Sequence, residues 1–237
     1  MTKTLKVLSL LLTYPTAELQ SSAPALRAAL AEDGLVLPAQ ITGLGRLLDE
    51  LERDDLYDLQ ERYVLLFDRT RSLSLHLFEH VYGESRDRGA AMVDLAQEHA
   101  RRGLAIGARE LPDFLPLFLE FLSILPLAEA RAWLAQTAHI IAALRQRLRK
   151  RRSSYAAVFK AIESLAKAPP SEAGLAALIP VEDDDPDDLE ALDRAWEDAP
   201  VTFGPNAGAE TCSRDRLISK VRAGLRPAPD VNPLPQR

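Results

Sequence analysis

The sequence has few cysteines, aromatic residues and glycines, and each shortage excludes a class of protein. One residue of 237 is a cysteine, Cys212, so the chain forms no internal disulfide and no cysteine cluster for zinc or for iron and sulfur. Aromatic residues make up 6% and glycines number 11, while alanine and leucine dominate, as in packed helices rather than turn-rich sheets. We therefore expect a helical protein of a reducing compartment, with a core held by packing alone.

Positive charge is outnumbered, because 29 lysines and arginines against 35 aspartates and glutamates give a formal net charge of -6. Such a chain is a poor nucleic-acid binder, since binding a polyanion rests on lysine and arginine, and it more naturally receives a basic partner. No apolar run approaches the roughly 20 residues that span a bilayer. The nearest candidate, Leu111 to Leu127, is interrupted by Asp113, Pro116, Glu120 and Pro126. The sequence predicts a cytoplasmic protein without direct membrane insertion, and the short apolar run at 7–12 predicts a first core helix rather than a signal peptide.

Apolar residues recur at helical spacing through the first two thirds of the chain, and proline, glycine and capping residues punctuate them. This pattern predicts helices over 5–14, 22–33, 38–52, 56–66, 85–103, 114–125, 127–150 and 155–166. In the longest of them a buried seam is expected, because apolar residues repeat every seven positions at Leu127, Leu134, Ile141 and Leu148. The fold class is all-α, a single multi-helix, bundle-like domain.

The composition changes after residue 168 towards proline, glycine and acid. Glu182 to Asp188 is an acidic run that repels itself and buries nothing, and 201–237 is rich in proline, glycine and alanine. We therefore place a helical domain at 1–168 and a mostly irregular, acidic and proline-rich tail at 169–237.

A five-residue pattern raises the possibility of catalysis. His76-Leu77-Phe78-Glu79-His80 fits H-x-x-E-H, in which two histidines hold zinc and a glutamate acts as base. A zinc-dependent hydrolase is therefore one alternative, although so short a pattern often arises by chance and two histidines at the edge of an apolar helix explain it as well. A generic helical scaffold for protein binding is another alternative.

The block from Phe67 to Gly89 alternates charges of both signs with aromatic and turn residues, for which a solvated network of ion pairs is the simplest interpretation. It also carries a family resemblance. The chain resembles the NarJ family of nitrate reductase assembly chaperones, within the wider TorD and DmsD group of redox-enzyme chaperones. The resemblance spans roughly residues 5–165 and rests on Leu11–Pro15, Tyr63–Arg69, Ser74–Leu95 and Glu110–Leu122.

This resemblance implies a TorD-like helical domain that works as a chaperone and not as an enzyme. The expected partner is the catalytic (alpha) subunit of respiratory nitrate reductase, especially its N-terminal segment. The chaperone would hold the immature subunit, delay its docking on the membrane partner and assist molybdenum cofactor insertion, with no cofactor bound permanently to itself. The resemblance leaves open the oligomeric state, a second client-binding surface, direct contact with the molybdenum cofactor and the role of the tail.

The resemblance also implies a client-peptide site. Glu110 to Phe114 is similar to a pattern of the wider group that ends in Pro-Asp-His, but Phe114 stands where the histidine would be, which puts any role of that histidine in doubt. Acidic side chains there could pair with a basic leader whose apolar face lies against leucine or phenylalanine. The predicted site residues are Phe67, Asp68, Arg69, Glu79, His80, Tyr82, Glu84, Arg86, Asp87, Arg88, Glu110, Asp113 and Phe114.

Overall fold

The computed structural model describes residues 1–69, 71–82, 87–107 and 110–178, and their regular elements are helices. One isolated antiparallel bridge joins His76 to Phe114. The predicted all-α class is thereby confirmed. The elements are α1 (Lys3–Leu11), α2 (Ala17–Ser21), α3 (Ala23–Asp33), α4 (Pro38–Arg53), α5 (Leu56–Tyr63), η1 (Val64–Asp68), η2 (Arg71–Leu73), α6 (Leu77–Tyr82), α7 (Asp87–Arg101), α8 (Leu115–Ile124), α9 (Leu127–Lys150), α10 (Ala156–Ala166) and α11 (Glu172–Leu178).

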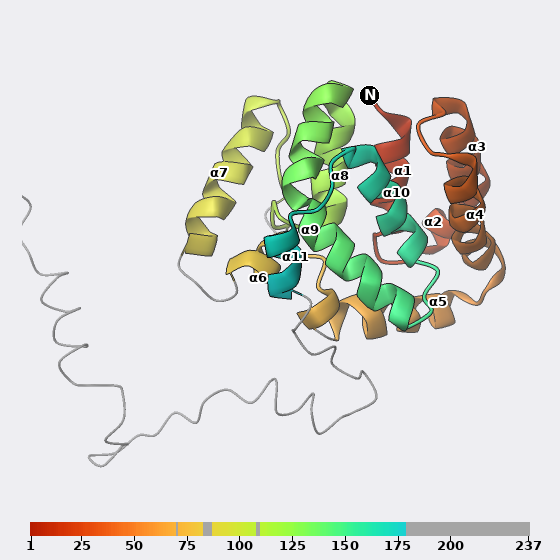
Figure 1. The fold of residues 1–237 in the computed structure, drawn as a ribbon. Helices are drawn as coiled ribbons and strands as arrows, with labels where there is room; N and C mark the ends of the chain where they lie inside the picture. Colours follow the sequence, from red (N-terminus) through yellow and green to blue (C-terminus); the bar gives the residue numbers. More distant parts are fainter. Residues whose placement is uncertain (70, 83–86, 108–109, 179–237) are drawn as a thin grey trace, which may run out of the picture. The chain divides into compact units, whose positions relative to one another are not determined.

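Helix α9 is the spine of the bundle, as its heptad pattern predicts. It packs most extensively against α10, while α1 packs against α8, and Figure 1 shows these helices at the centre of the described part. The seam residues Leu134, Ile141 and Leu148 are each at most 1% exposed. Leu127, at the start of the helix, stays partly exposed. The sequence periodicity therefore identifies the face that α9 buries.

A capping residue and a glycine mark a helix start and a helix end, as the sequence pattern predicts. Asp55 caps α5, since its Oδ1 accepts a hydrogen bond from Tyr57 N at 2.8 Å. Gly34 ends α3 with a φ of 62°, a left-handed conformation that glycine adopts without strain. The prediction left out α2, which Thr16 caps by accepting a hydrogen bond from Leu19 N at 3.1 Å. Five residues are too few for helical periodicity to be visible in the sequence.

After α5 the chain does not continue as the plain α-helix that the sequence predicts to residue 66. Val64–Asp68 forms a π-turn, in which Arg69 N donates to Val64 O at 3.0 Å, five residues back. Leu66 and Phe67 both point into the core from this turn, at 8% and 6% exposure. The π-turn therefore ends α5 while keeping two large adjacent side chains buried.

A short helix, α11, lies within the segment that the sequence assigns to the tail. It packs on α9, with Leu178 9% exposed and Leu175 against the core. Gly174 permits the close approach, because a Cβ there would lie 2.9 Å from Cδ2 of His139. The division of the chain at residue 168 stays a prediction, and the acidic run at 182–188 lies outside the described residues.

Helix α7, drawn in yellow in Figure 1, is fixed to the bundle through a buried histidine. His99 is fully buried, its ring stacks on Phe121 with centroids 4.1 Å apart, and its Nδ1 lies 2.8 Å from Leu95 O. Its Nε2 has no hydrogen-bond partner among the described residues. Burial lowers the pKa of His99 below its ordinary value of 6.5, although the Leu95 carbonyl opposes this shift. The neutral ring is therefore the form that the fold accommodates.

We expect His99 to make the fold less stable in mild acid. Because the pKa is lower in the folded state, the unfolded chain binds the proton more readily, and stability is lost as the pH falls below about 6.5. Urea unfolding at neutral pH and at lower pH, for the parent and for His99→Phe, measures this effect. The phenylalanine keeps the stacking and removes the titration, so the variant should lose less stability in acid. Equal losses in both proteins would contradict the prediction.

Candidate functional site

Asp113, a residue of the predicted client-peptide site, is fully buried where two segments distant in sequence meet. Its Oδ2 accepts a hydrogen bond from Phe78 N at 3.0 Å, in the first turn of α6, and its Oδ1 lies 3.2 Å from His76 Nδ1. The backbones of the two segments are also joined, because Leu77 N donates to Asp113 O at 3.0 Å and Leu115 N to Leu75 O at 2.8 Å. Asp113 therefore fixes the start of α6 against the approach to α8.

The charges around Asp113 are largely compensated within this cluster. Arg88 Nη2, from the first turn of α7, lies 3.2 Å from Glu79 Oε1 and 4.0 Å from Asp113 Oδ2. The side chains of Arg88 and Glu79 are 25% and 33% exposed. The predicted residues Glu79, Arg88 and Asp113 thus form one network that links α6, α7 and the segment before α8. Part of the acidic charge that was expected to be free for a basic peptide is neutralised by Arg88.

Two histidines of the H-x-x-E-H pattern take separate roles. The His76 ring lies against Phe114, with centroids 5.3 Å apart, so an imidazole stands beside Asp113 although residue 114 is not a histidine. His80 Nε2 lies 2.8 Å from Ser74 O, and burial is the main cause that lowers the pKa of His80. Within the described ranges, no group of three or more histidine, cysteine, aspartate or glutamate side chains is arranged to hold a metal ion.

The other predicted site residues are divided between this network and other surroundings. Phe114 is half-buried beside His76, Tyr82 packs edge-on against Phe78 with centroids 5.6 Å apart, and Glu110 is exposed. Asp87 is exposed at the start of α7. Glu84 and Arg86 lie outside the described residues.

Phe67 belongs to a different cluster of aromatic rings, and Asp68 and Arg69 directly follow it. Its ring lies 5.1 Å from that of Tyr63 and 5.0 Å from that of Tyr155, measured between centroids. Tyr63 also donates to Leu12 O at 2.9 Å, and burial raises its pKa. Burial is also the main cause that raises the pKa of Tyr155 to about 12. These rings are core residues that position the end of α5.

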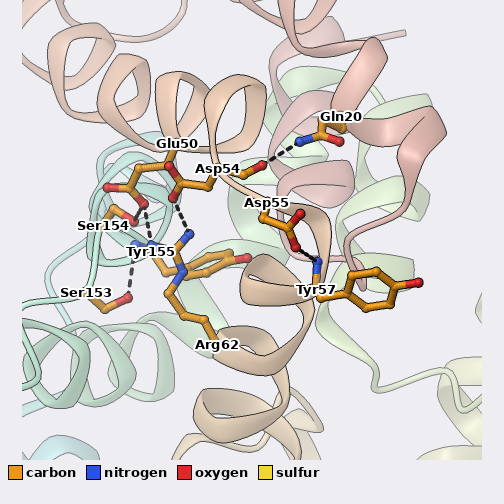
Figure 2. Close-up of polar contacts among 9 residues, drawn as sticks. All are labelled: Gln20, Glu50, Asp54, Asp55, Tyr57, Arg62, Ser153, Ser154 and Tyr155. Atoms are coloured by element: carbon orange, nitrogen blue, oxygen red, sulfur yellow. Dashed lines mark hydrogen bonds and ion pairs between the residues drawn. The ribbon is translucent and has the colours of Figure 1, made fainter.

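A polar network joins α4, α5 and the turn between α9 and α10 next to this aromatic cluster (Figure 2). Arg62 donates to Glu50 Oε2 at 3.2 Å and to Asp54 Oδ2 at 3.0 Å. Ser154 donates to the same Glu50 oxygen at 2.6 Å, and Gln20 of α2 donates to Asp54 O at 2.9 Å. The ends of α2, α4 and α5 are therefore held in one arrangement.

Three residues near the predicted site, His76, Val81 and Leu111, are not assigned to the client-peptide site by the sequence alone. His76 was considered as a zinc ligand, whereas it lies beside Asp113 and Phe114. Val81 and Leu111 are exposed apolar residues next to the network, 51% and 46% exposed. An apolar residue within a charged segment is the feature of the sequence that could have identified these two. Among the described helices, none is both long and apolar enough to cross a membrane.

The helical fold is also found in a proposed redox enzyme maturation protein. The crystal structure of that protein, from Archaeoglobus fulgidus, superposes with a TM-score of 0.51, at 22% sequence identity, over 70% of this chain and 94% of that one. This likeness shows the class of fold, an all-helical domain.

Sequence comparison identifies the family. The model of the nitrate reductase delta subunit family matches residues 17–161. The chain is 42% identical to the nitrate reductase molybdenum cofactor assembly chaperone NarJ of Escherichia coli K12, over 86% of each protein. It is 40% identical to NarW of the same strain, over 84% of this chain and 83% of that protein. The chain belongs to the nitrate reductase delta subunit family.

Proposed function

We propose that this protein is an assembly chaperone for a respiratory nitrate reductase. The observation that carries the proposal is the 42% identity to NarJ over 86% of each chain. In this role it binds the immature catalytic subunit, supports insertion of the molybdenum cofactor and delays membrane docking until assembly is complete. It acts in the cytoplasm, catalyses no reaction and keeps no cofactor of its own.

The mechanism proposed for this role is linkage rather than chemistry. A chaperone that binds the client before cofactor insertion more tightly than the finished client favours the unfinished state while it is bound. Cofactor insertion then weakens the complex and releases the client. The order of assembly follows from this difference in affinity, and no bond in the client needs to be made or broken by the chaperone.

We place the binding site for the client's N-terminal segment on the surface around Asp113. Val81 and Leu111 supply exposed apolar contacts, and the half-buried Phe78 and Phe114 lie three positions from them in sequence. Glu110 supplies an exposed negative charge. Asp113 is a positioning residue, since its carboxylate is fully buried and accepts the Phe78 N–H. Such a surface suits a segment with one apolar face and some positive charge.

Calorimetric titration with the N-terminal peptide of the nitrate reductase catalytic subunit of the same organism tests this proposal. The parent chain should bind the peptide saturably, and less tightly at raised salt because Glu110 is exposed to solvent. Val81→Ser combined with Leu111→Ser should weaken binding at least about tenfold, which corresponds to about 1.4 kcal/mol. Glu110→Lys should weaken it mainly at low salt.

Matched control variants show whether an effect on binding is specific to this site or follows from the same substitutions anywhere on the surface. The control for the apolar pair is Leu37→Ser with Val93→Ser, which replaces residues that are 63% and 56% exposed, the first at the N-cap of α4 and the second on α7. The control for Glu110→Lys is Glu172→Lys, on the exposed side of α11. No binding of the peptide to the parent would contradict the proposed client. Equal binding to all variants would contradict the proposed site.

A further inference from the structure

The outer side of α5 and of the π-turn that follows it presents exposed apolar and acidic side chains in one stripe. Tyr57, Glu61, Val64 and Asp68 follow each other at spacings of four, three and four residues, which places them on one helical face. Tyr57 is 79% exposed and Val64 is 36% exposed, and the two acidic residues are exposed as well. The opposite side of the helix carries Leu59 and Tyr63 into the core.

Tyr14 widens this stripe from a neighbouring segment. Gln60 Nε2 donates to Pro15 O at 2.9 Å, which holds the segment after α1 against α5. The Tyr14 ring meets Tyr63 edge-on, with centroids 5.6 Å apart, and remains 46% exposed. We define the α5 face as the set of Tyr14, Tyr57, Asp58, Glu61, Val64 and Asp68.

The acidic side chains of the α5 face differ from those around Asp113 in their ion pairing. Asp58, Glu61 and Asp68 take part in no ion pair within the part of the chain that the structure describes. Arg62, the cation of α5, is engaged by Glu50 and Asp54, and Figure 2 shows the Tyr57 ring pointing away from that network. This differs from the surface around Asp113, where Arg88 already compensates the acidic charge.

The α5 face is also held in place from behind. Arg62 ties α5 to the end of α4, Tyr63 donates to Leu12 O at 2.9 Å, and the ring of Tyr63 packs against Phe67. A surface that is ordered before binding costs less conformational entropy when a partner docks. Rigid support behind exposed apolar side chains is therefore consistent with recognition.

We propose that the α5 face docks a basic amphipathic helix of a partner protein. Apolar side chains of that helix lie against Tyr14, Tyr57 and Val64, and its lysines or arginines pair with the three acidic residues. Residues 56–68 extend for about 20 Å at the helical rise, which matches three to four turns of a partner helix. This surface is distinct from the one around Asp113, so the proposal goes beyond the proposed function and does not rest on the same residues.

The probe is a fluorescently labelled model peptide of about five helical turns, built from leucine and lysine at helical spacing. A peptide with glutamate in place of lysine is its charge control. Fluorescence anisotropy of the full-length chain with each peptide, at low and raised salt, gives the affinities. The basic peptide should bind saturably and lose affinity at raised salt, and the acidic peptide should not bind.

Two double variants test whether the α5 face is the binding surface. Asp58→Lys with Glu61→Lys should weaken binding at low salt at least about tenfold, and Tyr57→Ser with Val64→Ser should do so at both salt concentrations. The matched controls should bind as the parent does. They are Asp94→Lys with Glu172→Lys, and Leu37→Ser with Val93→Ser.

Two results would overturn this proposal. One is equal binding of the basic peptide to the parent, to both α5 variants and to the controls, because the peptide then binds non-specifically or at the surface around Asp113. The other is sedimentation of the parent as a dimer that Tyr57→Ser with Val64→Ser converts to a monomer, because the face would then contact a second copy of the chain. Val81→Ser with Leu111→Ser should leave binding at the α5 face unchanged, so this variant distinguishes failure of the present proposal from failure of the proposed client site.

Discussion

Replacing Asp113 by alanine is expected to destabilise the protein by about 2–4 kcal/mol, because it leaves buried hydrogen-bonding groups without their partner. The Phe78 N–H in the first turn of α6 loses its acceptor, and His76 and Arg88 lose the neighbouring negative charge. Asp113→Asn keeps one acceptor oxygen and should lose about half as much. Urea unfolding followed by circular dichroism gives both free energies of unfolding.

Glu110 provides the matched control for this prediction, since it lies three residues away and is exposed. Glu110→Ala should change the free energy of unfolding by no more than about 0.5 kcal/mol. Equal free energies of unfolding for Asp113→Ala and Glu110→Ala would contradict the prediction, because the buried carboxylate would then not hold α6 in place. Hydrogen exchange should also become faster in 77–82 of the Asp113 variant, because the first turn of α6 loses its cap.

The stability effect decides how binding data on Asp113 are interpreted. Reversing the charge of Glu110 and Asp113 together would place a lysine in a fully buried position, so weaker peptide binding could follow from local unfolding alone. The separate variants Glu110→Lys and Asp113→Asn resolve the two effects. The first changes the charge that a peptide meets, and the second changes the position of α6.

The all-α class and most of the bundle follow from patterns that are local in sequence. Leu134, Ile141 and Leu148 are buried because a seven-residue repeat places them on one face of α9. Asp55 and Gly34 act as a helix cap and a helix stop because their side-chain chemistry suits those positions whatever surrounds them. Such features depend on neighbours within a few residues and can be predicted without the fold.

The arrangement of the candidate site depends on contacts that are distant in sequence. Asp113 and His76 are 37 residues apart, and no local pattern shows that an aspartate beside a proline will be fully buried. Arg147 is one of several cations at the C-terminal end of α9, yet it is 5% exposed. Charged residues are mostly exposed, so the burial of a single arginine can be predicted only when its partners in the fold are known.

The second large effect is expected at Arg147, whose guanidinium connects three elements. Nη1 donates to Ser72 O and Nη2 to Leu178 O, both at 2.6 Å, so the side chain ties α9 to η2 and to α11. Arg147→Met keeps much of the apolar stem and removes the donors. Because two carbonyls then lose their partner, we expect a loss of about 2–4 kcal/mol in the free energy of unfolding, measured by urea unfolding.

Arg149 is the matched control for this variant, because it lies two residues further along the same helix and is exposed. Arg149→Met should change stability by no more than about 0.5 kcal/mol. Arg147→Lys should fall between the two variants, since one ammonium group cannot reproduce the fork that reaches both carbonyls. Equal stability of Arg147→Met and Arg149→Met would contradict the structural role of the buried guanidinium.

Hydrogen exchange locates the effect of Arg147→Met within the fold. Helix α11 has seven residues, too few for a stable helix in isolation, so its order depends on contacts with α9. Loss of the hydrogen bond to Leu178 O should therefore speed amide exchange in 172–178 more than in the core of α9. Exchange in 72–76 should rise as well, because Ser72 O loses the same side chain. Arg147 would then connect α11, through η2, to the segment that carries His76 beside Asp113.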